Sequence, residues 1–412
     1  MNLDPIEAVL EDVRRGRPIV MIDDSTRENE GDLMIAAQSV TPELINFMLI
    51  HGKGLVCVSL TEERLHQLGI PMQVVENTSS FGTNFAVSFD LRSAAGVGVT
   101  AEGRARTIRA VIDEASKPDD FVVPGFVFPV CAVPGGVLKR RGQTEGSVDL
   151  ARIAGLYPAG VICEIMDESG RMVRGEALER YCDLHQLKIT SVEEICQYRL
   201  HREVSLRRVA ELALSATSGL RRSPTLEKLL QHGGEGKFKV VVYIDDVDDK
   251  EHLAFVYGEP TADALVRIHS ECLTGDIFGS RRCDCGYQLD QALELVLRTG
   301  HGVVIYLHQE GRGIGLGNKL RAYELQDKGL DTVDANIHLG FEADERSYRA
   351  GAQMLADLGI HSVRLMTNNP EKVASLESFG VKVSERVHLP VSIDEYNRSY
   401  METKKARLGH MF

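Results

Sequence analysis

The amino-acid sequence predicts an α/β (α+β) protein of two domains, each a mixed sheet with packed helices. In both halves, apolar runs of strand length alternate with longer helical stretches, which is typical of sheets covered by helices. The length of 412 residues also exceeds what one hydrophobic core usually supports. Residues 196–237 are basic and helical at first and then loop-like, so we place the domains at 1–203 and 204–412.

Composition and charge exclude several classes of protein. Hydrophobic residues make up 43% and charged residues 26%, which is typical of a soluble globular protein. The formal net charge of −13 argues against broad binding to nucleic acid or to an anionic membrane. No apolar run reaches the ~18 residues of a membrane span, and the N-terminus lacks a signal-peptide pattern. Eight cysteines without a disulfide framework favour a reduced, cytoplasmic protein.

The first half begins with a predicted buried strand over residues 17–22 that leads into an acidic loop. Five acids fall within the ten residues 23–32, a density too high for a core element. Most such runs are solvated loops. The alternative is an oxygen-rich site for a hard cation such as Mg²⁺, which prefers carboxylates together with a substrate phosphate.

Further predicted elements alternate along the first half. Strands are expected over 54–60 and 161–166, and helices over 42–51, 102–115 and 148–154. The segment 135–145 is rich in glycine and basic residues just before the last of these helices, a pattern that suits a phosphate. Glu164 is a single acid in an apolar strand, where burial without a partner is costly.

Four motifs of the first half, taken together, resemble 3,4-dihydroxy-2-butanone 4-phosphate synthase over roughly residues 1–200. They are Arg27-Glu-Asn-Glu-Gly-Asp32, Asn77-Thr-Ser-Ser-Phe-Gly-Thr83, Gly136-Val-Leu-Lys-Arg-Arg-Gly-Gln-Thr-Glu145 and Pro158-Ala-Gly-Val-Ile-Cys-Glu164. The resemblance implies conversion of ribulose 5-phosphate into the four-carbon product and formate, with Mg²⁺. It further implies that Glu28 is a metal ligand and Glu164 an essential acid, and that the substrate is held by Arg27, Asp32, Arg140 and Thr144.

Four positions depart from the family motif, and each is a polar site position in the family. Gln143 stands where the family has its second metal ligand, a histidine; Phe126 and Phe81 replace two further histidines, and Gly103 replaces an acid. A glutamine amide is a weaker ligand than imidazole and cannot shuttle protons, and phenylalanine does neither. These departures predict a retained fold with a degenerate synthase site, a weakened Mg²⁺ site at Glu28 and Gln143, and weak binding of ribulose 5-phosphate.

The second half opens with a predicted hairpin, 237–244 and 253–257, followed by a strand over 264–269. Beyond it, helices are expected over 286–297, 318–328 and 349–358, with a short buried strand over 302–307. A further strand at 363–366 leads into Asn369-Pro370, which is an ordinary start for a helix.

Three cysteines, Cys272, Cys283 and Cys285, fall within fourteen residues of the second half. Thiolates so close together can share a zinc ion, and three protein ligands leave a fourth position for water, as in catalytic zinc sites. One alternative is a structural zinc completed by His269, because spacing alone does not exclude it. The other is three unrelated cysteines in a reducing cytosol, which the clustering disfavours.

Three polar clusters follow the cysteines. Glycines at 311, 313, 315 and 317 around Arg312 let the backbone approach an anion, although the spacing also fits a flexible connection. Asp344 is either a base that acts beside the Arg346 guanidinium, or one of the acidic residues commonly found in the first turn of a helix. Thr367 and Lys372 stand where a ligand at the start of the last predicted helix would lie.

The motifs of residues 238–412 resemble GTP cyclohydrolase II. They are His269-Ser-Glu-Cys-Leu-Thr-Gly-Asp, Arg282-Cys-Asp-Cys-Gly, Gln309-Glu-Gly-Arg, the run from Gly340 to Arg346, and Thr367-Asn-Asn-Pro, all in order. That family opens the imidazole ring of GTP and releases formate and pyrophosphate, which begins riboflavin biosynthesis. The order of the two halves resembles the fused bifunctional riboflavin enzymes.

The resemblance implies a role for each residue of this second site. Zinc is bound by Cys272, Cys283 and Cys285; Asp344 accepts a proton, Arg346 is the nucleophile toward the α-phosphate, and Tyr323 assists at the ring. GTP is contacted by Arg267, Ile268, His269, Ser270, Glu271, Gln288, Glu310, Gly311, Arg312, Thr332, Thr367 and Lys372. The chemistry agrees, because zinc-bound water has a pKa of about 7, and pyrophosphate departure requires cations and Mg²⁺.

Three functions compete for this chain. The first is a zinc-dependent GTP cyclohydrolase II with an inactive synthase-like domain, the second is a fully bifunctional enzyme, and the third is a non-catalytic zinc- and nucleotide-binding scaffold. Retention of Asp344, Arg346 and an open zinc position disfavours the scaffold. We expect the first function, with GTP as substrate, and a homodimer that follows from the family resemblance alone.

Overall fold

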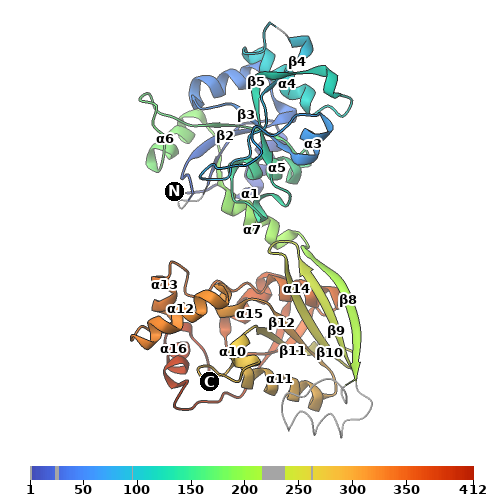
Figure 1. Cartoon of the computed structure of the whole chain (residues 1–412), viewed down its shortest axis with the longest axis vertical. Helices are drawn as coiled ribbons and strands as arrows, with labels where there is room; N and C mark the ends of the chain where they lie inside the picture. Colours follow the sequence, from blue (N-terminus) through green and yellow to red (C-terminus); the bar gives the residue numbers. More distant parts are fainter. Residues whose placement is uncertain (1, 24–26, 95, 216–236, 261–262) are drawn as a thin grey trace. The chain divides into compact units, whose positions relative to one another are not determined.

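The computed structural model describes residues 2–23, 27–94, 96–215, 237–260 and 263–412 of the chain (Figure 1). The chain divides into two compact units, Met1–Glu203 and Val204–Phe412, each with its own seven-stranded mixed sheet and packed helices. The predicted α/β (α+β) class is therefore confirmed. Among the described residues, no helix is both long enough and apolar enough to cross a membrane. The loop expected over 216–236 lies outside the described residues.

The sheet of the first unit has the order β4-β5-β3-β6-β2-β1-β7. Its strands are β1 (Ile19–Ile22), β2 (Gly31–Ala36), β3 (Cys57–Thr61), β4 (Phe89–Leu91), β5 (Phe121–Ala132), β6 (Gly160–Glu164) and β7 (Ile189–Ser191). Its helices are α1 (Ile6–Arg14), α2 (Pro42–Phe47), α3 (Glu62–Gln67), α4 (Ala101–Val111), α5 (Gln143–Ile153), α6 (Glu176–His185) and α7 (Val192–Arg202). The pairs β1–β7 and β3–β5 are parallel, and the remaining pairs are antiparallel.

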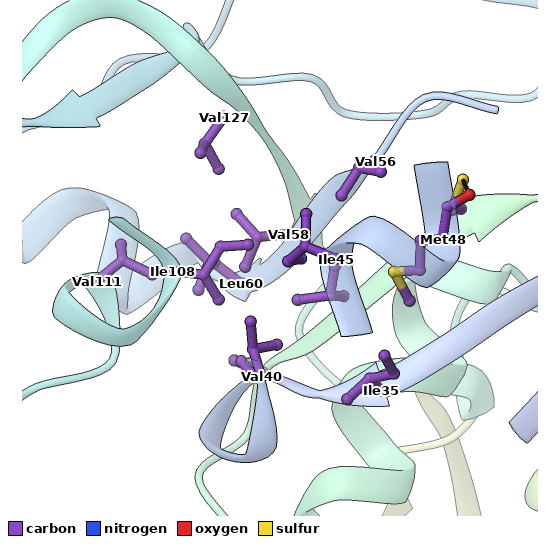
Figure 2. Packing of buried hydrophobic residues seen from close by; sticks show 14 of the residues in the cluster. Ile35, Val40, Ile45, Met48, Val56, Val58, Leu60, Ile108, Val111 and Val127 are labelled. Atoms are coloured by element: carbon purple, nitrogen blue, oxygen red, sulfur yellow. Dashed lines mark hydrogen bonds between the residues drawn. The ribbon is translucent and has the colours of Figure 1, made fainter. Parts of the chain in front are cut away.

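Apolar side chains on both faces of this sheet form the core of the first unit. Ile35 of β2 packs on one face in a cluster with Ile108 of α4 (Figure 2). Its neighbour Met34 packs on the other face in a cluster with Leu150 of α5. Since successive side chains of a strand point to opposite faces, a strand buried on both sides is apolar throughout. This burial holds β2 beside β6, and with it the polar residues at their ends.

The sheet of the second unit has the order β14-β13-β11-β12-β10-β9-β8. Its strands are β8 (Leu206–Ser215), β9 (Lys237–Asp245), β10 (Lys250–Tyr257), β11 (Asp263–Ser270), β12 (Gly302–Leu307), β13 (Ser362–Met366) and β14 (Lys382–Val387). Its helices are α10 (Leu273–Asp276), α11 (Cys285–Thr299), α12 (Gly315–Asp327), α13 (Thr332–His338), α14 (Arg349–Asp357), α15 (Pro370–Ser378) and α16 (Arg398–Leu408). The strands β12, β11, β13 and β14 are parallel, so their carboxyl ends share one edge.

Strand β8 corrects the sequence-based prediction, which made the first part of this segment helical. Leu206 to Ser215 pair antiparallel with β9. The basic residues that suggested a helix, Arg207 and Arg208, instead form ion pairs with Asp246 and Asp357. Charged side chains are common on a strand at the edge of a sheet. Pairing with a distant strand, and not the local pattern, therefore decides the conformation here.

Candidate active sites

The three cysteines of the second unit meet beyond the carboxyl end of β11. The Sγ atoms of Cys272, Cys283 and Cys285 lie within 4.8 Å of one another, and those of Cys272 and Cys283 are 3.6 Å apart. Gly275 permits this approach, because a Cβ atom there would lie 2.9 Å from the Cys283 sulfur and 3.1 Å from the Cys272 sulfur. Three convergent sulfur atoms fit a zinc ion.

His269 is not among the possible metal ligands that group with the cysteines in the described part of the chain. Its Nε2 lies 3.0 Å from an Asp276 carboxylate oxygen, and its ring stacks on Tyr306 with the centroids 5.5 Å apart. Among the described residues, the group of possible metal ligands around Cys272 consists of sulfur atoms alone. The geometry therefore gives no support to a closed zinc site completed by His269.

Lys319 is a site residue that the sequence analysis missed. It is buried on α12, with its Nζ 3.2 Å from Cys272 Sγ, 3.0 Å from Thr274 Oγ1 and 2.8 Å from Glu310 Oε1. Burial alone would lower the pKa of this ammonium. Cys272 and Glu310 raise it by more than burial lowers it, so the net shift is upward. One signal was available in the sequence, because Lys319 stands four residues before Tyr323 and so shares its helix face.

The glycine-rich segment forms a tight turn, Glu310–Gly313, between β12 and α12. Gly311 and Arg312 both adopt left-handed backbone conformations, with φ of 63° and 62°. For arginine this conformation is strained, and such strain is typical of functional sites. The buried Nη2 of Arg312 has no hydrogen-bond partner among the described residues. A strained turn that presents an unpaired guanidinium nitrogen suits an anionic ligand.

Asp344 and Arg346 form a bidentate ion pair. Arg346 Nε lies 2.8 Å from Asp344 Oδ1, and the second contact joins Nη2 to Oδ2. Burial alone would raise the pKa of Asp344. The hydrogen bonds and charge of Arg346 lower it by more, so the pKa is shifted downward overall. Burial alone would lower the pKa of Arg346, but Tyr348 and Asp344 raise it by more, so its net shift is upward. The pair is therefore held in its ionised form.

Buried cations extend from the end of β11 to the start of α15. Arg267 donates to the Met366 carbonyl at 2.9 Å and to Gln288 Oε1 at 2.6 Å. Lys372 donates to the Ile268 carbonyl at 2.9 Å. Both side chains are buried, and among the described residues neither has a carboxylate within 4.0 Å. Uncompensated buried positive charge is unfavourable, so binding of an anion here would be favoured.

The charge imbalance is visible at Lys372. Burial, followed by the charges of Arg267 and Arg346, holds the pKa of its ammonium well below the usual value. Thr367 directly follows the strand β13, and its Oγ1 accepts a hydrogen bond from Asn369 N at 3.0 Å. Asn369 caps α15 by accepting from Glu371 N at 3.0 Å, so the predicted capping role is confirmed.

Most of the residues predicted to contact GTP border two adjoining hollows. The metal compartment is lined by the three cysteines together with Ser270, Glu271, Glu310, Gly311, Arg312, Tyr323, Thr332 and Arg346. The cationic compartment is lined by Arg267, His269, Ser270, Arg312, Arg346, Thr367 and Lys372. Three further predicted residues line neither compartment but contact residues that do. Ile268 and Asp344 each bind a cation that borders the cationic compartment, and Gln288 bridges Arg267 and Asp284.

The first unit gathers its candidate residues around Arg27. The Nη1 atom of Arg27 lies 2.9 Å from Asp23 Oδ2 and 2.7 Å from Gln143 Oε1. Its Nη2 atom lies 2.9 Å from Glu28 Oε1. Helix α5 begins at Gln143, five residues before its predicted start, so that residue faces the acidic loop from the first turn of a helix. The structure thus brings together residues 116 positions apart.

A pair of carboxyl groups lies across the strands β2 and β6 of the first unit. Asp32 and Glu164 are register partners, and Glu164 accepts a hydrogen bond from Leu55 N at 2.7 Å. Burial, then the charges of Glu164 and Glu28, raises the pKa of Asp32 well above its usual value. The buried Oδ1 of Asp32 has no partner among the described residues. Carboxylate oxygens suit Mg²⁺, but among the described residues no three of the carboxyl groups here lie close enough together to form a metal-binding group.

Arg140 stands three residues before the start of α5. Its Nη1 donates to Glu145 Oε2 at 2.5 Å, and its Nη2 donates to the Phe81 carbonyl at 3.1 Å and to Thr83 Oγ1 at 3.2 Å. Thr144 is buried in the first turn of α5. The guanidinium therefore ties the segment before α5 to the loop that carries Phe81.

The four departures from the synthase motif fall in two places. Phe81 and Gln143 are at the Arg27 cluster, where the Arg27 guanidinium carbon lies 5.7 Å from the Phe81 ring centre. Gly103 lies against the loop before α4, and a Cβ atom there would be 2.0 Å from the Val97 carbonyl oxygen. Phe126, half exposed on β5, contacts the same loop. No side chain fits at position 103 without moving that backbone.

Comparisons with known proteins agree with both resemblances. Residues 7–198 match the family model of 3,4-dihydroxy-2-butanone 4-phosphate synthase, and residues 225–388 match that of GTP cyclohydrolase II. The riboflavin biosynthesis protein RibBA of Aquifex aeolicus is 48% identical over 416 residues, which cover 100% of this chain and 98% of that protein. RibBA of Bacillus subtilis is 47% identical over 410 residues, covering 99% of this chain and 98% of that protein.

A solved structure is similar across both units. RibBX from A. baumannii, described as a two-domain 3,4-dihydroxy-2-butanone 4-phosphate synthase, is 32% identical with a TM-score of 0.64, covering 93% of this chain and 99% of that one. The prediction of a degenerate, inactive first domain is not borne out by these findings. The synthase family model matches residues 7–198 despite the four departures, and the full-length relatives are similar from end to end.

Proposed function

The chain belongs to the family of RibBA riboflavin biosynthesis proteins, and on this premise we propose that it is a fully bifunctional enzyme. The second unit opens the imidazole ring of GTP and releases formate and pyrophosphate. The first unit converts ribulose 5-phosphate to 3,4-dihydroxy-2-butanone 4-phosphate and formate. One observation carries the GTP assignment: a cluster of three sulfur atoms adjoins a hollow lined by buried cations without carboxylate partners.

In the second unit, Cys272, Cys283 and Cys285 would hold zinc. Bound there, zinc supplies a Lewis acid that activates water near neutral pH. Lys319 places a positive charge against the Cys272 sulfur and holds Glu310 at the same time. Glu310 Oε2 accepts one hydrogen bond, from Leu273 N at 2.6 Å, and keeps a lone pair for the guanine edge.

Arg346 stabilises the departing pyrophosphate in this proposal. Its guanidinium borders both compartments, where the α-phosphate of a bound nucleotide would lie. The raised pKa of Arg346 makes loss of a proton unfavourable, which favours electrostatic stabilisation over direct nucleophilic attack. Asp344 fixes the plane of the guanidinium through the bidentate pair.

In the first unit, carboxyl groups would bind the metal and exchange protons in place of the histidines that the family has. By the family resemblance, Glu28 would bind Mg²⁺, which stabilises negative charge on a substrate oxygen. The pKa of Asp32 is raised well above its usual value, first by burial. A carboxyl group with a raised pKa is suited to exchange a proton with a carbon beside a substrate carbonyl. Arg27 and Arg140 supply positive charge for the phosphate.

A second candidate is a cyclohydrolase whose first unit binds substrate without turnover. One observation favours it: the Arg27 guanidinium already neutralises Glu28 and occupies the Gln143 oxygen, the two groups at the family's metal position. A divalent cation would have to displace that guanidinium.

Formate release, measured separately from GTP and from ribulose 5-phosphate, tests the proposal. We expect formate from both substrates, and loss of metal together with GTP ring opening in Cys283→Ser. Formate from GTP alone would establish the second candidate, and Gln143→His would then be the first variant to try for recovery. Formate from neither substrate would favour the non-catalytic scaffold. The homodimer stays a prediction, to be checked by sedimentation.

A further inference from the structure

The C-terminal segment of the chain borders the candidate GTP site. Helix α16 lies beside α13 (Figure 1). Tyr400 of α16 lines both the metal compartment and the cationic compartment. Lys404 and His410 line the cationic compartment. The sequence analysis assigned no role to any of the three.

Two contacts near its C-terminal end hold this segment against the second unit. Arg407 of α16 lies 2.5 Å from Asp331 and 3.0 Å from Asp334, at the start of α13. Beyond the helix, Met411 N donates to the Asn368 carbonyl at 2.9 Å, next to the end of β13. The segment is therefore a fixed wall of the compartment.

Lys404 connects α16 to the cysteine cluster. Its Nζ lies 2.8 Å from Asp284 Oδ1, and Asp284 stands between Cys283 and Cys285 in the sequence. The other oxygen of Asp284 accepts from Gln288 Nε2 at 2.5 Å, and Gln288 Oε1 accepts from Arg267 at 2.6 Å. A continuous chain of hydrogen bonds thus joins the C-terminal helix to Arg267.

The compartment contains more positive charge than its own carboxylates balance. Asp284 and Asp344 pair with Lys404 and Arg346, and we find no carboxylate within 4.0 Å of Arg267 or Lys372 in the described part of the chain. Burial, then the charge of Lys404 and of the other cations, lowers the pKa of His410 to about 3. Several buried cations converging on one hollow favour a ligand with several negative charges.

We propose that α16 and the residues after it form part of the polyphosphate-binding site, with Lys404 and His410 binding the triphosphate of the nucleotide. Tyr400 lies where the triphosphate enters the metal compartment. Lys404 is a binding residue whose position is set by Asp284. The proposal rests on the proposed GTP function for the identity of the ligand, but the site itself is a polyanion site.

Binding of inorganic tripolyphosphate and of guanosine to the full-length protein tests the proposal. We expect Lys404→Met to weaken tripolyphosphate binding by on the order of tenfold, and to leave guanosine binding unchanged. His410→Gln should weaken the same probe by a smaller factor. Lys405→Met is the matched control, because Lys405 is the next residue of α16 and is exposed; it should bind both probes as the unmodified protein does.

A second variant separates binding from folding, because Lys404→Met leaves the buried Asp284 without its partner. The double variant Lys404→Met/Asp284→Asn removes both charges and restores neutrality. If Lys404 binds the polyanion, the double variant stays weakened; recovery of tripolyphosphate binding would overturn the proposal. Absence of tripolyphosphate binding in the unmodified protein would overturn it as well. If binding depends on Lys404 while GTP is not opened, only the proposed function fails.

Discussion

Lys319 brings a buried positive charge to the three cysteines. With the proposed Zn²⁺ bound, the three thiolates and the ion would carry a net negative charge, and the Nζ of Lys319, 3.2 Å from Cys272 Sγ, would offset part of it. The same ammonium holds Glu310 at 2.8 Å, so it links the metal cluster to the proposed guanine contact. Groups in contact with metal ligands commonly change metal affinity when they are removed.

Replacing Lys319 by methionine tests this link. We expect Lys319→Met to release zinc to a chelator about 10–100-fold more readily, because an uncompensated thiolate cluster holds its metal less well. Lys328→Met is a suitable control, since Lys328 follows the same helix and is exposed. Zinc release at the unmodified rate would show that the lysine has no part in holding the metal.

Arg346 offers a second test at a single residue. Arg346→Ala should lower the rate of pyrophosphate release on the order of 10²–10³-fold, as expected when a group that stabilises developing charge is removed. Zinc content should not change, because the guanidinium pairs with Asp344 and not with a cysteine. Arg364→Ala removes an exposed ion pair with Glu385 and serves as the control. Near-normal turnover of Arg346→Ala would remove this residue from the mechanism.

Among the secondary-structure elements, the pairing of β2 with β6 has a consequence for stability. It places Asp32 opposite Glu164, and burial, then Glu164, raises the pKa of Asp32 well above the value of 3.8. A carboxyl group with a raised pKa holds more protons in the folded state than in the unfolded one. The stability of the first unit should therefore fall as the pH rises from 3.8 through the folded pKa.

Asp32→Asn should remove part of this pH dependence. At pH 8 the variant should melt at a higher temperature than the unmodified protein, because folding no longer has to protonate or bury the Asp32 carboxylate. A gain of about 1 kcal/mol corresponds to about 2–4 °C for a unit of this size. The exposed Asp183→Asn on α6 provides the control. A lower melting temperature for Asp32→Asn at pH 8 would contradict this account, and the measurement is calorimetry of the full chain at pH 6 and pH 8.

Considered as a whole, the molecule has two units with separate cores. The core clusters of the first unit lie between Val9 and Cys196, and those of the second between Phe238 and Leu389. No core cluster of the described residues draws on both units. Damage to the chemistry of one unit should therefore leave the other working.

Two variants check this independence. Glu164→Gln should abolish formate release from ribulose 5-phosphate, since the acid that the family resemblance makes essential is lost, and should leave release from GTP within about twofold. Cys283→Ser should show the reverse pattern. Loss of both activities in either variant would mean that the units depend on each other, and paired formate assays on the two proteins are the measurement.

The sequence by itself determined those features whose chemistry is local. Cys272, Cys283 and Cys285 are close along the chain, so a tight turn is enough to bring their sulfur atoms together. The strands β1, β3 and β6 of the first unit and β9 to β13 of the second were foreseen at least in part, because periodicity and β-branched runs act over a few residues. The two-domain α/β (α+β) class follows from the same local patterns.

Only the tertiary structure decided the features that join distant residues. Lys319 meets Cys272 across 47 positions, Arg27 meets Gln143 across 116, and Lys404 meets Asp284 across 120. A lysine on a helix has the same local pattern whether it is solvated or buried against a thiolate. Strand β8 likewise depends on its pairing with β9. Such contacts are set by how whole sheets and helices pack. Burial among those elements lowers the local dielectric, and this strengthens the interactions between charges.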